Sequence, residues 1–357
     1  MSRWGGSWSP RVFRVLVFRA LASAALLAGA ALSAGCTSRD EADAPDAGRL
    51  QVITTVAPLT NIVAAVAGDR AEVTGLVPEG ADSHTFEPPP SAAEKLARAD
   101  VVYLNGLALD EPIRMVAEAN GDEVEGGDGG SGDRPRIVPL GDLALPEPDR
   151  LYDRSFPRSE GRPNPHLWTA PRYAIAYARL IAEDLGARDP AHAPGYEANL
   201  ARFEAGVGDL DRAMRSSFAT IPVTQRKLLT YHDAYAYFAR DYGFEIIGAV
   251  QPTSFSEPTP KQVAALIEQV RRLGVPAIFG SEVFPSPVLE QIGKEANVRY
   301  VDELRDDDLP GDPGDARHSL IGLLRYNYLT ITEALGGDAS ALRRLTPTGV
   351  DHATYPQ

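Results

Sequence analysis

The stretch DPAHAPGYEANLARFEAGVGDLDRAMRSSF, at residues 189–218, decides the fold that we expect for this chain. Its large apolar residues recur at spacings of three and four, which is typical of one buried face of an α-helix. They are Tyr196, Leu200, Phe203, Val207, Leu210, Met214 and Phe218. At roughly 1.5 Å per residue such a helix is about 42 Å long, so it can cross a whole domain. The stretch therefore predicts one long helix that links the parts of the chain on either side of it.

Strand-like and helix-like segments alternate on both sides of this linking helix. Before it, a strand and helix pair at residues 50–68 precedes a buried-type strand at 100–105. After it, strands at 227–231 and 276–280 flank a helix at 260–273. Such alternation is typical of parallel sheets covered by helices, in which ligands bind beyond the carboxyl ends of the strands. We therefore predict an α/β fold: two β/α lobes with mostly parallel sheets, joined by one long rigid α-helix.

Changes in composition and in apolar periodicity divide the chain further. A glycine-rich and acidic stretch at residues 121–133 has no apolar periodicity and indicates a surface loop. It belongs to an irregular region, 120–165, of the first lobe. The expected parts are a signal peptide (1–35), a tether (36–48), an N-terminal lobe (49–188), the linking helix (189–218), a C-terminal lobe (219–337) and a tail (338–357).

The N-terminus has the organisation of a secretion signal. Basic residues from Arg3 to Arg19 precede an uncharged stretch at 20–35, which is shorter than the ~20 residues that span a bilayer. The segment resembles a lipoprotein signal peptide, with cleavage before Cys36 and lipid attached to its thiol. Ser33 stands where such signals usually carry Leu, and an ordinary secretory signal or an uncleaved anchor are the alternatives. We expect an extracytoplasmic protein that is anchored to the cell membrane by lipid on Cys36.

Charge and cysteine usage exclude several classes of function. The chain has 49 acidic and 35 basic residues, a net charge of −14. So acidic a chain is a poor nucleic-acid binder, because phosphate backbones require Lys and Arg. The single Cys excludes an intramolecular disulfide, an iron–sulfur cluster and a cysteine zinc site.

The residues that could carry chemistry are histidines and acids at predicted strand ends. His84 and His232 each follow a strand, His166 precedes a helix, and Asp302 ends a strand. Each could instead be structural: a surface histidine, a helix-entry residue packed on Trp168, or a helix N-cap. No short spacing unites the four, so only the fold can bring them together. We expect the acidic run at 306–308 to be a solvated loop, because it lacks the calcium-loop pattern.

Five motifs in order resemble one protein family. They are GADSHTFE at 80–87, DVVYLNG at 100–106, NPHLWTAP at 164–171, YHDAYAYF at 231–238 and RYNYL at 325–329. Together, behind a lipoprotein-like signal, they are similar to the zinc- and manganese-type solute-binding lipoproteins of ABC importers. The similarity covers about residues 50–337. The resemblance implies a binding protein, not an enzyme, that works as a monomer with a cognate ABC permease and holds its metal in the cleft between the lobes.

The resemblance also implies the metal ligands. Carried over position by position, His84 and His166 come from the N-terminal lobe, and His232 and Asp302 from the C-terminal lobe. The match at Asp302 is looser, because the family's aspartate usually precedes a turn with Pro or Gly, and Glu282 is the nearest substitute or a supporting group.

The ligand chemistry favours zinc. Three imidazoles and one carboxylate suit tetrahedral Zn²⁺, whereas Mn²⁺ prefers more oxygen ligands. Family members of the manganese type carry Glu at the position of His232. Many zinc members have a His-rich loop that is missing here, because residues 120–134 contain no His. The alternatives are a Mn²⁺- or Fe²⁺-binding member of the family, a zinc-dependent hydrolase, a binding protein for an iron chelate or corrinoid, and an adhesin.

Overall fold

The computed structural model describes residues 49–119, 122–123, 135–250, 258–281, 287–347 and 353–356, and of residues 122, 123, 302 and 303 only the backbone. The expected signal peptide, the tether and Cys36 lie outside these residues, and so does Glu282. The described residues belong to one unit, Arg49–Gln357. None of the helices that the structure describes is both long enough and apolar enough to cross a membrane.

The N-terminal lobe is built on a parallel sheet in the order β10-β2-β1-β3-β5-β4. Its central strands are rich in Val, Ile and Leu, and most of their side chains are buried, as expected where helices cover both faces of a parallel sheet. The strands are β1 (Leu50–Thr54), β2 (Ala71–Gly75), β3 (Val101–Leu104), β4 (Asp122–Glu123), β5 (Arg136–Pro139) and β10 (Ala353–Thr354). The helices are α2 (Ala57–Ala67), α3 (Pro90–Ala97), α4 (Glu111–Glu118), α5 (Leu140–Ala144) and α6 (Pro171–Arg188), with short 3₁₀ turns at Gly68–Arg70, Glu147–Asp149, Arg158–Glu160 and Leu167–Thr169.

The C-terminal lobe contains a second parallel sheet, in the order β7-β6-β8-β9. The predicted α/β class with two mostly parallel sheets is therefore confirmed. The strands are β6 (Lys227–Thr230), β7 (Glu245–Ala249), β8 (Ala277–Ser281) and β9 (Arg299–Leu304). The helices are α8 (Ala236–Tyr242), α9 (Pro260–Leu273), α10 (Pro287–Ala296) and α11 (Leu320–Ala334), with a 3₁₀ turn at Val223–Gln225.

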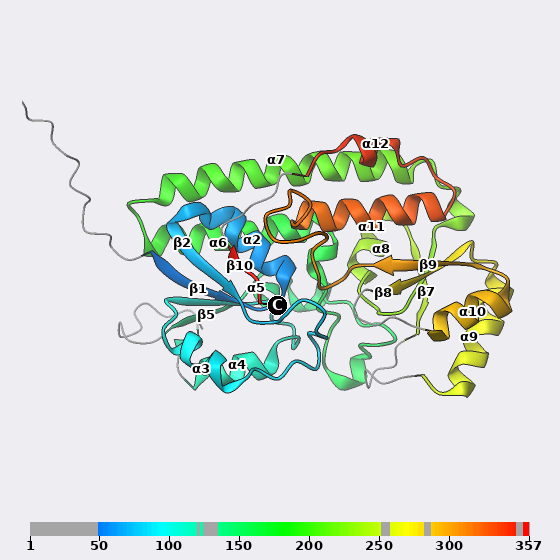
Figure 1. Cartoon of the computed structure of the whole chain (residues 1–357), viewed down its shortest axis with the longest axis horizontal. Helices are drawn as coiled ribbons and strands as arrows, with labels where there is room; N and C mark the ends of the chain where they lie inside the picture. Colours follow the sequence, from blue (N-terminus) through cyan, green and yellow to red (C-terminus); the bar gives the residue numbers. More distant parts are fainter. Residues whose placement is uncertain are drawn as a thin grey trace, which may run out of the picture. The chain divides into compact units, whose positions relative to one another are not determined.

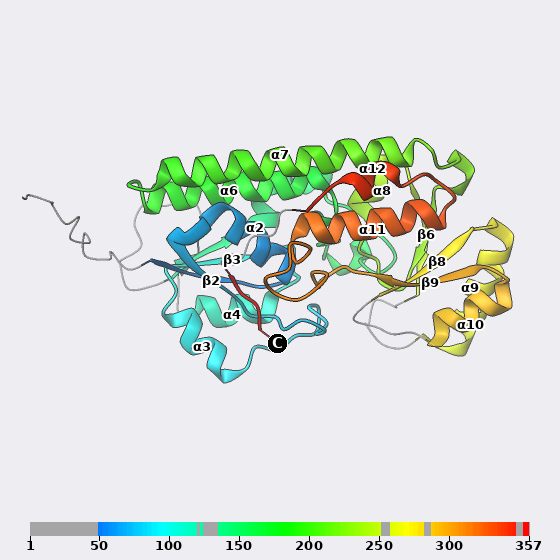
Figure 2. The same cartoon turned by 45° about the horizontal axis from the view of Figure 1, so that its top comes forward.

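The long helix α7 (Ala193–Phe218) runs beside both lobes (Figures 1 and 2). It begins four residues later than the predicted stretch, because Asp189–His192 form a turn before Ala193 and Pro194 start the helix. Of its predicted apolar face, Leu200 is half-buried and the other six side chains are buried. The helix packs on α6 and α2 of the first lobe and on α11 and α12 (Ser340–Arg344) near the second. It therefore contacts structure on both sides of the lobe boundary.

The hydrophobic core is also continuous between the lobes. One buried cluster joins Val52 and Val102 of the first sheet to Phe238, Phe279 and Leu323 of the second lobe. A smaller cluster lies under α9 and α10. Because interiors packed in this way resist deformation, we expect the lobes to move little relative to one another.

The C-terminal residues differ from the expected tail. They form α12 and β10, and β10 pairs in parallel with β2 through Ala353 opposite Val73 and Thr354 opposite Thr74. Residues 353–356 thus return to the N-terminal lobe (Figure 1). A two-residue strand has no periodicity in the sequence, which is why this pairing escaped prediction.

Candidate metal centre

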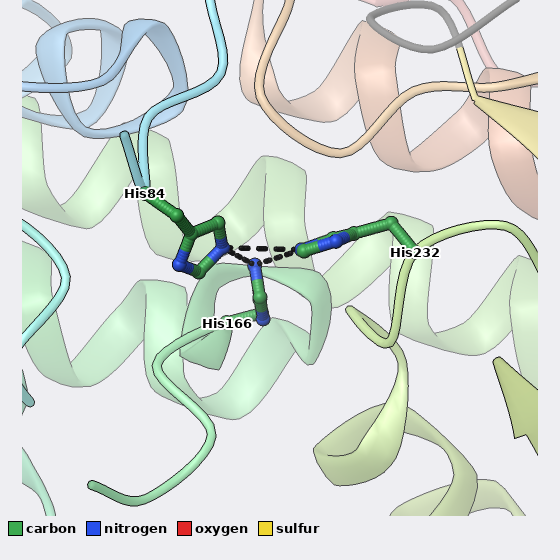
Figure 3. Close-up of side chains that lie close together, drawn as sticks. All are labelled: His84, His166 and His232. Atoms are coloured by element: carbon green, nitrogen blue, oxygen red, sulfur yellow. Dashed lines mark hydrogen bonds between the residues drawn. The ribbon is translucent and has the colours of Figure 1, made fainter. Parts of the chain in front are cut away.

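Three histidines from three separate loops meet at one point. His84 follows β2, His166 precedes the 3₁₀ turn Leu167–Thr169, and His232 follows β6. Figure 3 shows their imidazole rings converging, with dashed lines between the nitrogens. Two of the three therefore come from the carboxyl-end side of the parallel strands, where this class of fold binds ligands.

The spacing of the ring nitrogens suits a single metal ion. The Nε2 atom of His84 lies 3.1 Å from that of His166 and 3.1 Å from that of His232, and the latter two are 2.9 Å apart. Metal–nitrogen bonds of ~2.0–2.1 Å at tetrahedral angles separate two ligand atoms by about 3.3 Å. Among the described side chains, these three are the only such cluster, with all ligand atoms within 4.8 Å of one another.

Burial favours the neutral form of the His84 and His166 imidazoles. His166 and His232 are buried, and His84 is half-buried. Desolvation, and then the neighbouring His232, hold the pKa values of His84 and His166 well below the usual histidine range. A neutral imidazole has a free lone pair, and that form of histidine binds metals.

Asn164 sets the tautomer of His166. Its Nδ2 amide donates to Asp153 Oδ2 and to the carbonyl oxygen of Asp233, each at 2.7 Å. The Oδ1 atom of Asn164 must therefore accept, so the His166 Nδ1–H donates to it at 2.9 Å. Nε2 of His166 then carries the lone pair that faces the other two histidines. The sequence contained this signal, because Asn164 opens the NPH motif, but its role was not predicted.

An aspartate completes the surroundings of the cluster. Asp306 Oδ2 lies 3.8 Å from His232 Nε2. The Asp306 Oδ1 atom accepts from Ser281 Oγ at 3.2 Å, and its carbonyl accepts from Trp168 Nε1 at 2.8 Å. Asp306 is only 3% exposed. The position predicted for this role, Asp302, lies within β9, and its side chain is outside the described residues.

The expectation of a solvated acidic loop at 306–308 is wrong. All three aspartates are buried. Asp308 Oδ2 accepts from the backbone N–H of Gly80, which lies in the loop that carries His84. The prediction failed because three consecutive acids normally prefer water. Their burial is tolerated here because contacts between the two lobes provide hydrogen-bond partners for the carboxylates.

Phe156 covers the histidines, and the sequence did not single it out. Its ring centroid lies 5.5 Å from that of His84, 5.7 Å from His166 and 6.5 Å from His232. On the other side of the cluster, Trp168 packs on His166 with ring centroids 5.2 Å apart. The predicted packing of His166 on Trp168 thus coexists with its place in the cluster. The site is lined by aromatic rings that limit the access of water.

Fold and site together define a two-lobe metal-binding protein, and comparison with known proteins agrees. Residues 52–355 match the family model described as "Zinc-uptake complex component A periplasmic". The chain is 29% identical over 307 residues to the manganese-binding lipoprotein MntA of Halalkalibacterium halodurans, covering 86% of this chain and 95% of that protein. It is 28% identical to the iron-binding protein YfeA of Yersinia pestis, covering 92% and 98%.

A solved structure shows the same architecture. The periplasmic zinc-binding protein TroA from Treponema pallidum aligns with a TM-score of 0.70 at 25% identity, covering 81% of this chain and 99% of that one. The chain therefore belongs to the zinc-uptake component A family. It is the extracytoplasmic metal-binding component of an ABC transporter and not an enzyme.

Proposed function

We propose that this protein captures Zn²⁺ outside the cytoplasm and delivers it to a cognate ABC permease. The observation that carries this proposal is the convergence of three imidazoles, His84, His166 and His232, with Nε2 atoms 2.9–3.1 Å apart. The two lobes both supply ligands, so a bound ion links them. Lipid on Cys36 anchors the monomer to the membrane beside the permease.

The choice of zinc rests on the donor atoms. Three nitrogens and one carboxylate oxygen match the tetrahedral geometry that zinc adopts, whereas manganese favours oxygen-rich, higher-coordinate sites. The names of the relatives divide between manganese, iron and zinc, so they support a divalent transition metal without selecting one.

We further propose Asp306, in place of Asp302, as the fourth ligand. Its Oδ2 atom is 3.8 Å from His232 Nε2. A small side-chain rotation would shorten this distance to the separation of about 3.3 Å between two ligand atoms of a tetrahedral zinc ion. Asp306→Asn should weaken zinc binding by about 10-fold or more, because a neutral amide oxygen replaces the charged ligand. Isothermal titration calorimetry, or titration in competition with a chelator, measures the zinc affinity of the variant.

Two matched variants control the Asp306 experiment. Asp302→Asn and Asp307→Asn change the same side chain within the same segment. Both should bind zinc within about threefold of the wild type, since ligation at one carboxylate leaves its neighbours without a bond to the ion. Loss of affinity in either control, with Asp306→Asn unaffected, would reassign the fourth ligand.

The metal itself is tested by elemental mass spectrometry of the domain 37–357, purified without an affinity histidine tag. We expect about one zinc per chain, and none in the His84→Ala/His232→Ala double variant, because one imidazole and one carboxylate cannot hold the ion. Circular dichroism confirms that the variant is folded. Manganese or iron in the wild type would keep the transport role but replace zinc, and a chain that takes up no metal on titration would overturn the proposal.

A further inference from the structure

The loop at residues 151–164 covers the metal centre and has its two ends tied together. The backbone N–H of Asn164 donates to the Leu151 carbonyl at 2.8 Å. The Tyr237 hydroxyl joins the same two residues, since it donates to the Asn164 carbonyl at 2.9 Å and accepts from the Leu151 N–H at 3.2 Å. A loop whose ends are joined in this way is an Ω-type loop, a class that frequently carries function.

This loop also forms one wall of a small cavity at the histidine cluster. The cavity has a volume of about 20 Å³, which is room for a water molecule or a bare metal ion. Its wall contains His84 but neither His166 nor His232, which are buried behind it. The 151–164 loop contributes Phe156, Glu160 and Arg162 to this wall. An ion that arrives through this cavity meets His84 first.

Phe156 separates the cavity from the inner imidazoles. It lines the cavity and also lies 5.7 Å, between ring centroids, from His166. It is 6% exposed, so its ring replaces water at the cluster. Because an ion exchanges its hydration water for protein ligands as it enters, an apolar ring at this place slows both entry and exit.

A pair of opposite charges lines the same cavity on its solvent side. Arg162 Nη2 lies 3.1 Å from Glu160 Oε2, and both side chains are exposed. Arg162 and His84 line the same cavity, so an ion on its way to His84 passes the guanidinium. A guanidinium within reach of the first ligand repels an approaching cation, whereas the carboxylate beside it attracts one.

We propose that the metal ion enters and leaves through this cavity, with Phe156 as its gate and with Glu160 and Arg162 setting the rate of entry. This inference rests on the proposed function, because it concerns the same cargo ion. It assigns Phe156, Glu160 and Arg162 of the 151–164 loop a role in kinetics and not in ligation. The gate and the charge pair are therefore separable from the ligands by experiment.

The test is stopped-flow measurement of zinc association and of zinc transfer to an excess of fluorescent chelator. In Phe156→Ala both rates should rise about tenfold, while the Kd changes by less than about threefold, because removing a gate lowers one barrier in both directions. Phe156→Leu keeps an apolar side chain and should show smaller increases, and it serves if the alanine variant is unstable. A faster release with a proportionally weaker Kd and an unchanged association rate would overturn the gate.

The charge pair is tested in the same way at low and high salt. Arg162→Gln should speed zinc association about threefold at low ionic strength, and Glu160→Gln should slow it by a similar factor, with both effects shrinking as salt screens the charges. Arg271→Gln, from the exposed Glu268–Arg271 pair of α9, is the matched control and should leave the rate unchanged. Equal rates in all four proteins would overturn the entry route.

Failure of the proposed function would look different. A wild-type protein that takes up no zinc at equilibrium removes the cargo and the inference together, whereas stoichiometric zinc with unaltered variant rates removes the inference alone.

Discussion

At the scale of the residue, the metal centre depends on how its ligands are oriented. The side-chain amide of Asn164 bonds to the His166 ring, the Asp153 carboxyl and the Asp233 backbone. It therefore joins one ligand loop to the segment that follows His232. Burial and the neighbouring Asp153 carboxyl raise the pKa of Asp233, and burial raises that of Asp153. The amide of Asn164 is thus part of a polar network that has been removed from water.

Replacement of Asn164 tests this positioning role. Asn164→Ala removes the acceptor for the His166 Nδ1–H, so we expect zinc affinity to fall about 10- to 100-fold, as for other partners of ligating histidines. Asn199→Ala is the control, since Asn199 donates to the Val66 carbonyl far from the cluster. Zinc titration of both variants in the same zinc buffer compares their affinities. Equal affinity in Asn164→Ala and wild type would contradict the assigned tautomer.

At the scale of the element, α11 shows how local sequence and tertiary packing combine. Ser319 caps the helix, because its hydroxyl accepts from the Gly322 N–H at 3.1 Å. A side chain at position 322 would overlap the carbonyl oxygen of Arg317, so the first turn accepts only glycine there. The loop before α11 contains the Asp306–Asp308 segment, and the helix entry therefore helps to place that loop against the metal centre.

Two glycine-to-alanine substitutions in helices should change the free energy of unfolding in opposite directions. Gly322→Ala should lower the free energy of unfolding by about 1–3 kcal/mol, because backbone must shift to admit the methyl group. Gly195→Ala, in the first turn of α7, meets nothing within 4 Å and should raise it by about 0.5 kcal/mol through helix propensity. Urea unfolding measures both. A Gly322→Ala protein as stable as Gly195→Ala would show that the α11 entry is adaptable.

At the scale of the whole molecule, the lobes are connected in several ways. Helix α7 contacts both, one buried cluster continues from the first sheet to the second lobe, and β10 returns from the C-terminal end to β2. Contacts also cross beside the metal centre, such as the bond from the Gly80 N–H to Asp308. A wide hinge motion would break many of these contacts at once.

Zinc binding should therefore change the overall dimensions very little. We expect the radius of gyration from small-angle X-ray scattering to differ by less than about 1 Å between zinc-loaded and chelator-treated protein, because a stiff connection permits only small adjustments. The double variant His84→Ala/His232→Ala, treated identically, gives the baseline. A contraction of several ångströms on loading would contradict the stiff arrangement.

The sequence by itself determined the class of fold, the long helix and the three histidines. These depend on local signals: the three- and four-residue spacing within 189–218, the alternation of strands and helices, and motifs such as NPH around His166. Such signals survive in a single chain because each reflects the chemistry of neighbouring residues. The membership of the family followed from the same motifs taken in order.

Only the tertiary structure decided which acid stands beside the histidines, what covers them and where the C-terminal strand pairs. The family resemblance favoured Asp302, and the sequence predicted a solvated loop for Asp306, four residues further on. Asp306 instead lies beside His232, because it comes after β9 ends, where Ser281 and His232 of neighbouring segments lie within reach. Phe156 and β10 likewise acquire their places from residues far away in the chain. Long-range contacts of this kind leave no local pattern, and the free energy that selects them exists only in the packed protein.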